Sequence, residues 1–295
     1  MSEGRFRSSS VSLITRGSSR TTLRADDGVL IEAVYDPCTA DDGARAGADD
    51  SGTAIVVAHG FTGSADRPAV RRAVEVFAQR AAVITFSFRG HGGSGGRSTV
   101  GDREVLDLAA AVAWARSLGH RRVVTVGFSM GGSVALRHGA LYTDPAAERE
   151  GVRSVPLRGG RTEARLGACA DAVVSVSSPA RWYYRGTAPM RRLHWMVTRP
   201  GGRLVGQYGF RTRIARDGWD PVPLSPVAAV PLIAPTPLLI VHGDRDPYFP
   251  LDHPRMLAEA ADGAAELWLE RGMGHAENAA DAALLGRLAD WAVDR

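Results

Sequence analysis

Lysine does not occur among the 295 residues of this chain, so all 36 basic residues are arginine. Cysteine is nearly absent as well: Cys38 and Cys169 are too few for a disulfide framework, and we expect both to be thiols. A charge-free stretch of 20 residues, Val222–Val241, could cross a bilayer by its length, but its five prolines exclude a membrane helix. The N-terminal region also lacks the apolar core of a signal peptide. These absences predict a soluble, cytoplasmic protein.

The composition is that of a globular chain with two basic segments. Hydrophobic residues make up 44% and charged residues 23%, which excludes a chain that is disordered throughout. The net charge is only +4. However, residues 1–24 hold five arginines and one acid, and residues 181–216 hold nine arginines and no acid. The rest of the chain is therefore net acidic.

Short apolar runs alternate with amphipathic segments from residue 54 onward. Runs of consecutive apolar residues are typical of strands buried on both faces. The runs are Ile55–Ala58, Val83–Phe88, Val123–Phe128, Ala172–Val176, Leu238–Val241 and Glu266–Leu269. Between them, apolar residues recur at helical spacing in Val70–Phe77, Val105–Val112, Met256–Ala260 and Leu284–Trp291. This alternation predicts an α/β fold with a mainly parallel sheet.

Other segments fall outside the alternation. Thr22–Tyr35 is predicted to form a hairpin that turns at Asp27-Gly28. Residues 1–20 are expected to be a flexible basic tail, and residues 39–52 and 143–167 polar loops. Residues 177–236 separate two predicted strands by about 60 residues, and a connection of that length usually covers a functional site.

Residues 127–131 read G-F-S-M-G, a G-x-S-x-G motif between a predicted strand and the predicted helix Ser133–Tyr142. A sharp strand-to-helix turn exposes the hydroxyl of the middle residue, and glycine on both sides lets strand and helix approach closely. The same letters also occur in plain glycine-rich turns. The strand–turn–helix context favours Ser129 as a nucleophile.

A serine nucleophile needs a histidine to take its proton and a carboxylate to orient that histidine. Among eight histidines, His275 is the only one in a glycine-rich turn after the last apolar strand. Asp246 closely follows another predicted strand; Asp244 and Asp252 are alternatives, since aspartates near helix starts usually cap them. The order Ser129, Asp246, His275 places all three at the carboxyl ends of strands, where open α/β sheets build their sites.

Backbone N–H groups that stabilise an oxyanion are the third requirement for acyl transfer. Residues 59–63, H-G-F-T-G, follow the first of the central predicted strands. This position would set the Phe61 N–H opposite the Met130 N–H. We therefore predict that these two amides form an oxyanion hole.

Together these motifs make the chain resemble the α/β-hydrolase superfamily, and within it the bacterial serine esterases and lipases. The resemblance covers about residues 22–295 and rests on H-G-F at 59–61, F-R-G-H-G-G-S at 88–94, G-F-S-M-G-G at 127–132, H-G-D-R-D-P at 242–247 with P at 250, and G-H at 274–275. It implies an eight-stranded, mostly parallel sheet flanked by helices, in which Ser129 follows the fifth strand, Asp246 the seventh and His275 the eighth. It also implies a small cap, residues 177–236, inserted after the sixth strand into a catalytic domain of residues 21–176 and 237–295.

The resemblance also bears on single positions. Relatives often have Asp where this chain has Ser87, two residues before Arg89, and this departure concerns the local turn more than the mechanism. Arg89 and His91 are interpreted as residues that shape the loop, with substrate contact as the alternative. A nucleophilic Ser129 argues against epoxide hydrolase and haloalkane dehalogenase chemistry, in which a carboxylate is the nucleophile. No metal or organic cofactor is implied.

The basic segment 181–216 also carries aromatic residues. Pro189 is expected to open a short helix that the P-G-G at 200–202 stops. In one interpretation, the aromatic side chains pack on the catalytic domain, and the arginines lie in water or pair with the acidic residues of that domain. In the other, the cap attracts an anionic ester or an anionic membrane surface. Arginines interleaved with aromatics can also bind single-stranded nucleic acid, but no motif of a nucleic-acid-binding fold accompanies this segment. The predicted substrate contacts are Trp182, Tyr183, Trp195 and Tyr208.

We therefore expect a serine hydrolase that cleaves a carboxylic ester of small or medium acyl size through an acyl-serine intermediate. The same triad would also serve a thioesterase, acyltransferase, amidase or perhydrolase. A non-catalytic receptor on this fold is the remaining alternative, although such proteins usually lose a triad member. The expected partner is a small-molecule ester, without nucleic acid or stable membrane insertion.

Overall fold

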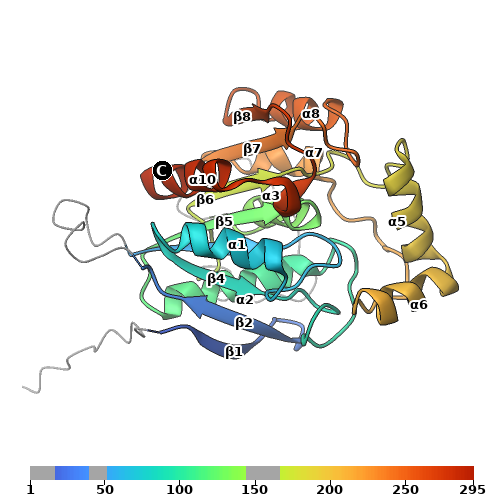
Figure 1. The fold of residues 1–295 in the computed structure, drawn as a ribbon, viewed down its shortest axis with the longest axis horizontal. Coiled ribbons are helices and arrows are strands. Elements are labelled where there is room, and N and C mark those ends of the chain that lie inside the picture. The colour runs from blue at the N-terminus through green and yellow to red at the C-terminus, as the bar shows by residue number, and fades with distance from the viewer. Residues whose placement is uncertain (1–16, 40–51, 144–166) are drawn as a thin grey trace, which may run out of the picture.

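The computed structural model describes residues 17–39, 52–143 and 167–295. Most of the predicted N-terminal tail, and most of the predicted loops 39–52 and 143–167, lies outside the described residues (Figure 1). The last two residues of the predicted tail, Ser19 and Arg20, belong to the first strand, where they pair with Tyr35 and Val34. The sheet therefore begins earlier than the composition of the tail indicated.

The centre of the molecule is a sheet of eight strands in the order β1-β2-β4-β3-β5-β6-β7-β8 (Figure 1). The β1–β2 and β2–β4 pairs are antiparallel, and the other neighbours are parallel. This confirms the predicted fold class. The strands are β1 (Ser19–Arg24), β2 (Leu30–Asp36), β3 (Thr53–Ala58), β4 (Ala82–Phe86), β5 (Arg122–Phe128), β6 (Ala172–Val176), β7 (Leu238–Gly243) and β8 (Ala265–Glu270).

The apolar runs of the sequence lie in strands β3 to β8. Every residue of β3, β4, β6 and β7 is buried, which explains why these strands are apolar at consecutive positions. The run predicted to reach Phe88 ends as a strand at Phe86. Beyond it, the Ser87 N–H still donates to the Glu32 carbonyl of β2 at 3.0 Å, whereas the Phe88 N–H donates to the His59 ring at 3.0 Å. The predicted hairpin is present as β1 and β2, with Gly28 (φ 85°) in its turn.

Helices cover both faces of the sheet (Figure 1). Apolar side chains of each group of helices form a separate buried cluster with the strands. Because both faces are covered, the ends of the strands remain as the place for a site. On one face lie α1 (Pro68–Phe77), α9 (Ala276–Ala279) and α10 (Ala282–Asp294); on the other lie α2 (Glu104–Ser117), α3 (Met130–Leu141), α7 (Pro226–Ala229) and α8 (Asp252–Ala260).

The connection between β6 and β7, residues 177–237, is here called the β6–β7 insertion. It holds α5 (Ala188–Thr198), α6 (Pro200–Gly209), α7 and a 3₁₀ helix (Val230–Leu232). Helices α5 and α6 project beyond the sheet, at the right of Figure 1. As predicted, Pro189 lies in the first turn of α5. As predicted, α5 ends before the P-G-G at 200–202. A second helix that the sequence analysis did not predict, α6, begins at Pro200, since proline suits the first helical position.

The proline-rich stretch Val222–Val241 forms α7, the 3₁₀ helix and part of β7. Within the described ranges, no helix is both long and apolar enough to span a membrane. The five prolines, which the sequence analysis took to exclude one long helix, thus lie in a stretch of short elements.

The β6–β7 insertion is hydrogen-bonded to the loop that follows β4. The Arg213 N–H donates to the Gly90 carbonyl at 2.7 Å. The neighbouring Arg89 is 2% exposed and pairs with Asp107 at 2.7 Å and Asp27 at 2.5 Å. Burial alone would lower the pKa of Arg89, but these two carboxylates raise it above its ordinary value. These contacts agree with the interpretation of Arg89 as a residue that shapes this loop.

The Ser87 position, where relatives often have Asp, is supplied with a carboxylate from another strand. The Ser87 hydroxyl donates to the Glu32 carboxylate at 2.5 Å and accepts the Ala65 N–H at 3.1 Å. Glu32 also accepts the Gly93 N–H at 2.9 Å. The carboxylate that accepts hydrogen bonds in this turn is therefore that of Glu32 in β2.

The buried Arg89–Asp107 pair and the exposed Arg80–Asp290 pair provide a matched test of stability. In the first pair the side chains are 3% and 0% exposed, and in the second 47% and 53%. We expect Asp107→Ala to lower the free energy of unfolding by about 3–5 kcal/mol, because it removes the main partner of a buried charge. We expect Asp290→Ala to lower it by less than about 1 kcal/mol. Urea unfolding followed by circular dichroism measures both; similar small losses would contradict the structural role of Asp107.

Candidate active site

Ser129 lies on the turn between β5 and α3, directly after the last strand residue. Its backbone has φ 52° and ψ −113°, a strained conformation for a residue with a side chain. The Ser129 N–H donates to the Val176 carbonyl at 2.8 Å, and the Ser129 carbonyl accepts the Ser133 N–H at 3.1 Å. These bonds hold the turn, and the Ser129 side chain lines a cavity.

Close backbone approach explains the glycines on either side of Ser129. A Cβ atom on Gly127 would overlap the carbonyl of Gly131. A Cβ atom on Gly131 would overlap the carbonyl groups of Ala58 and His59 at the end of β3. The turn can therefore pack against β3 only with glycine at both positions.

His275 and Asp246 complete a hydrogen-bonded chain with Ser129. The His275 Nε2 atom lies 2.9 Å from Ser129 Oγ, and His275 Nδ1 lies 2.7 Å from Asp246 Oδ2. An ionised carboxylate can only accept, so His275 Nδ1–H donates to it and His275 Nε2 is free to accept the Ser129 proton. Burial opposes ionisation of Asp246, but the bond from His275 and its charge lower the pKa of Asp246 below its ordinary value.

The two alternative acids are engaged elsewhere. The Asp244 carboxylate accepts the Gly272 N–H at 2.6 Å. Asp252 is the first residue of α8 and pairs with Arg181 at 2.9 Å. Of the three candidate aspartates, only Asp246 contacts His275.

Residues after β7 fix the positions of Asp246 and His275. The Tyr248 and Phe249 N–H groups donate to Asp246 Oδ1 at 2.8 and 3.1 Å. The Tyr248 ring stacks on the His275 ring with centroids 4.2 Å apart. The His242 Nε2–H donates to the Phe249 carbonyl at 2.9 Å. The segment 242–249 thus contains the Asp246 carboxylate and the groups that hold it in place.

The predicted oxyanion donors lie at the ends of β3 and β5. Met130 is the first residue of α3, where an N–H has no carbonyl partner within the helix. In the part of the chain that the structure describes, neither the Phe61 nor the Met130 N–H donates to another group. His59 holds the Phe61 loop, since its Nδ1–H donates to the Gly60 carbonyl at 2.7 Å. Burial lowers the pKa of His59 to about 3, so this histidine stays neutral.

A cavity of about 890 Å³ contains Ser129, His275, Phe61 and Met130 in its wall. The β6–β7 insertion forms much of the remaining wall. Of the predicted substrate contacts, Trp182, Tyr183 and Trp195 line the cavity. The rings of Trp182 and Tyr183 both pack on the Trp219 ring, with centroid distances of 5.1 and 5.3 Å. The sequence analysis did not single out Trp219.

The fourth predicted contact, Tyr208, does not line this cavity, and it is 76% exposed. The buried residues of α6 are Gly202 and Gly206. A Cβ atom on Gly202 would overlap the backbone of Trp195 and Met196 in α5. Because the glycine side of α6 packs on α5, Tyr208 is turned toward solvent, and its assignment as a substrate contact is not supported.

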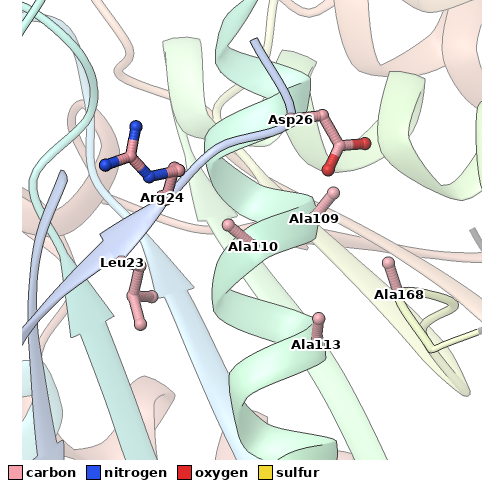
Figure 2. Close-up of a pocket in the computed structure, with 7 residues that line it drawn as sticks. All are labelled: Leu23, Arg24, Asp26, Ala109, Ala110, Ala113 and Ala168. Atoms are coloured by element: carbon pink, nitrogen blue, oxygen red, sulfur yellow. The ribbon is translucent and has the colours of Figure 1, made fainter. Parts of the chain in front are cut away.

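The loop residues Arg89 and His91 are buried and do not line the cavity. A second cavity of about 220 Å³ lies between the end of β1 and helix α2 (Figure 2). Its wall consists of Leu23, Arg24, Asp26, Ala109, Ala110, Ala113 and Ala168, without a serine, cysteine or histidine. Across residues 17–39, 52–143 and 167–295, no group of three His, Cys, Asp or Glu side chains is arranged to hold a metal ion. The large cavity is therefore the candidate active site.

The model of a family described as the alpha/beta hydrolase family matches residues 55–285 of the chain. The chain belongs to the alpha/beta hydrolase family. No curated protein matches this hydrolase.

Solved structures resemble this alpha/beta hydrolase over nearly its whole length. The Pyrococcus furiosus esterase Pf2001 is 21% identical, with 93% of this chain and 91% of that chain covered and a TM-score of 0.63. XC6422 from Xanthomonas campestris, described as an a/b serine hydrolase without lid, is 18% identical, with 96% of each chain covered and a TM-score of 0.59. DcsB in complex with its substrate analogue is 16% identical, with 94% and 99% covered and a TM-score of 0.65. At these identities the likeness shows the fold.

Glu277 is a residue of the hydrolase cavity that the sequence interpretation missed. It is 6% exposed, lines the cavity two residues after His275, and its Oε1 atom accepts the Gly60 N–H at 3.0 Å. A Cβ atom built on Gly60 would meet both Glu277 oxygens and the Ser129 Cβ within 3.5 Å. Glu277 therefore lies beside the nucleophile and holds the peptide that precedes Phe61.

The geometry predicts that Glu277 orients the Phe61 N–H through Gly60. We expect Glu277→Ala to lower kcat by about 10- to 100-fold, somewhat less than the loss of a whole oxyanion donor. KM should change much less. Glu277→Gln retains an oxygen that can accept the Gly60 N–H, so its kcat should stay within about threefold of wild type.

Steady-state hydrolysis of 4-nitrophenyl acetate measures both variants, and urea unfolding checks that each is folded. A Glu277→Gln variant as impaired as Glu277→Ala would contradict a role through the hydrogen bond.

Proposed function

We propose that this protein is a serine hydrolase that cleaves a carboxylic ester of small or medium acyl size. Ser129 is the nucleophile, His275 the general base and acid, and Asp246 the residue that orients His275. The observation that carries the proposal is the chain of contacts from Ser129 Oγ to His275 Nε2 (2.9 Å) and from His275 Nδ1 to Asp246 Oδ2 (2.7 Å). Membership of the alpha/beta hydrolase family supports it.

The reaction proceeds in two acyl transfers. His275 Nε2 accepts the Ser129 proton while Ser129 Oγ attacks the carbonyl carbon of the ester, and the ionised Asp246 stabilises the resulting imidazolium. Collapse of the tetrahedral intermediate breaks the ester C–O bond, and His275 protonates the departing alcohol. Water, deprotonated by His275, then attacks the acyl carbon. The bond between Ser129 Oγ and the acyl group breaks, His275 returns the proton to Ser129 Oγ, and the acid is released.

The Phe61 and Met130 amides are the proposed oxyanion donors. Each donor follows a residue whose own N–H is held by a hydrogen bond. Phe61 follows Gly60, which donates to Glu277, and Met130 follows Ser129, which donates to the Val176 carbonyl. Donors that already point at the developing charge need no reorganisation, and each contributes roughly 10²–10³ in rate.

We propose that the β6–β7 insertion acts as a cap over this site. Exposed side chains such as those of Tyr183 and Trp195 line the same cavity as Ser129, so water can enter it. Access of water favours hydrolysis over transfer of the acyl group to another acceptor.

Labelling with a fluorophosphonate probe tests the nucleophile. The probe should label the wild type and fail to label Ser129→Ala, because it reacts only with an activated serine. Ser133→Ala is the matched control, since Ser133 lines the same cavity one turn along α3 and should leave labelling unchanged. An unlabelled wild type would favour a non-catalytic receptor, and equal labelling of Ser129→Ala would contradict Ser129 as the nucleophile.

The role of Asp246 predicts a large effect of a small change. In Asp246→Asn the amide can present a donor to His275 Nδ1, which favours the wrong tautomer. We expect kcat to fall by roughly 10³–10⁴-fold with little loss of stability. Asp244→Asn, which alters a neighbouring carboxylate that does not contact His275, should retain activity within about threefold. Ester hydrolysis rates of both variants decide between Asp246 and Asp244 as the orienting acid.

A further inference from the structure

Arginine side chains of the β6–β7 insertion line the same cavity as Ser129. The nine arginines of residues 181–216 have no acidic neighbour within that segment. The structure divides them into those that line the cavity and those that do not. The lining group consists of Arg181, Arg185, Arg192, Arg203 and Arg216.

These five guanidinium groups differ in what they contact. Arg181 pairs with Asp252, and Arg203 donates to the carbonyl groups of Val197 and Thr198. Arg216 precedes Asp217, which lines the cavity with it. Within the residues that the structure describes, the side chains of Arg185, Arg192 and Arg216 form neither an ion pair nor a hydrogen bond. Because Arg216 adjoins the acidic Asp217 in the chain, Arg185 and Arg192 are the two of these three without an adjacent acid.

The charge of Arg185 acts on the cavity wall. His194, also in the wall, has its pKa lowered first by burial and then by the positive charge of Arg185. His194 therefore remains neutral near neutral pH and adds no charge of its own. The uncompensated positive charge at this wall belongs to arginine.

Charge and polarity change along the cavity. The Glu277 carboxylate, 6% exposed, lies at the buried end beside Ser129. Arg185 and Arg192 are exposed and lie at the solvent rim. Aromatic side chains including Trp182 and Trp219 contribute to the remaining wall. An anionic group would be repelled next to the nucleophile and attracted at the rim.

We propose that the substrate is an amphipathic ester with an anionic group, a carboxylate or a phosphate, at the end remote from the scissile bond. Arg185 and Arg192 bind this group, and the aromatic wall covers the apolar chain that joins it to the ester. This proposal rests on the proposed ester hydrolysis at Ser129. It favours a small substrate over an anionic membrane because the unpaired arginines line the cavity of the nucleophile.

Matched substrates test the proposal. The mono-4-nitrophenyl ester of suberic acid carries a free carboxylate, and its ω-methyl ester is neutral with the same scissile bond. We expect wild-type kcat/KM to favour the anionic ester by about 10-fold at low salt, the effect of two partly screened charge pairs. Arg185→Gln/Arg192→Gln should abolish this preference and leave the neutral ester within about twofold. An ω-phosphate analogue distinguishes phosphate from carboxylate as the preferred anion.

The control variant is Arg199→Gln/Arg211→Gln, which removes the same charge from two exposed residues of the insertion outside the cavity wall. It should keep the preference for the anionic ester. An equal loss in both double variants would mean long-range steering by net charge and would overturn the proposed site. Equal kcat/KM for both esters in the wild type would overturn it as well.

The test separates failure of this proposal from failure of the proposed function. A wild type that hydrolyses the neutral ester and is labelled by fluorophosphonate, but shows no anionic preference, refutes only the anion site. A wild type that hydrolyses neither ester and is not labelled refutes the ester hydrolysis itself. Sedimentation with phosphatidylserine vesicles, combined with no preference among soluble esters, would instead assign the arginines to a membrane surface.

Discussion

The tight turn at Ser129 is the constraint on which the arrangement of the site depends. A residue with φ 52° between a buried strand and a helix is strained, and it persists because neighbouring backbone groups hold it. The glycines at 127 and 131 allow this turn to pack against the end of β3. That contact brings the loop of Phe61 beside the start of α3. One steric requirement thus places the nucleophile and both proposed oxyanion donors together.

Hydrogen-bond partners distinguish His275 from the other histidines around it. Burial lowers the pKa of His59 to about 3 and of His253 to about 4, and it also lowers the pKa of His242. These neutral rings serve as hydrogen-bonding groups: His59 holds the Gly60 loop, His242 the Phe249 carbonyl and His253 the Ala180 N–H. Among the contacts of the described residues, His275 is the only histidine that both contacts Ser129 and donates to a carboxylate. The difference lies in the partner that each ring faces.

What the sequence could predict was chemistry set by residues close together in the chain. The G-x-S-x-G turn, the strand order of Ser129, Asp246 and His275, and the parallel sheet follow from local patterns of glycine and apolar residues. The bond between Glu277 and Gly60 joins residues 217 positions apart, and the Ser87–Glu32 bond spans 55. No local pattern marks such partners.

The outward turn of Tyr208 has a related cause. It depends on which side of α6 packs against α5, and that side is lined by glycine rather than by the aromatics that composition singled out. Apolar character alone therefore could not place this residue.

The absence of lysine bears on the chemistry of the site as well as on its charge. A lysine amine can lose its proton when buried and act as a base, whereas an arginine guanidinium stays protonated at any ordinary pH. The 36 basic side chains of this chain can therefore bind anions but cannot accept a proton. Proton transfer near neutral pH is left to histidine, and the histidine that contacts the nucleophile is His275. The same composition makes the charge at the cavity rim independent of pH, so the pH dependence of the reaction and the binding of an anion are carried by separate residues.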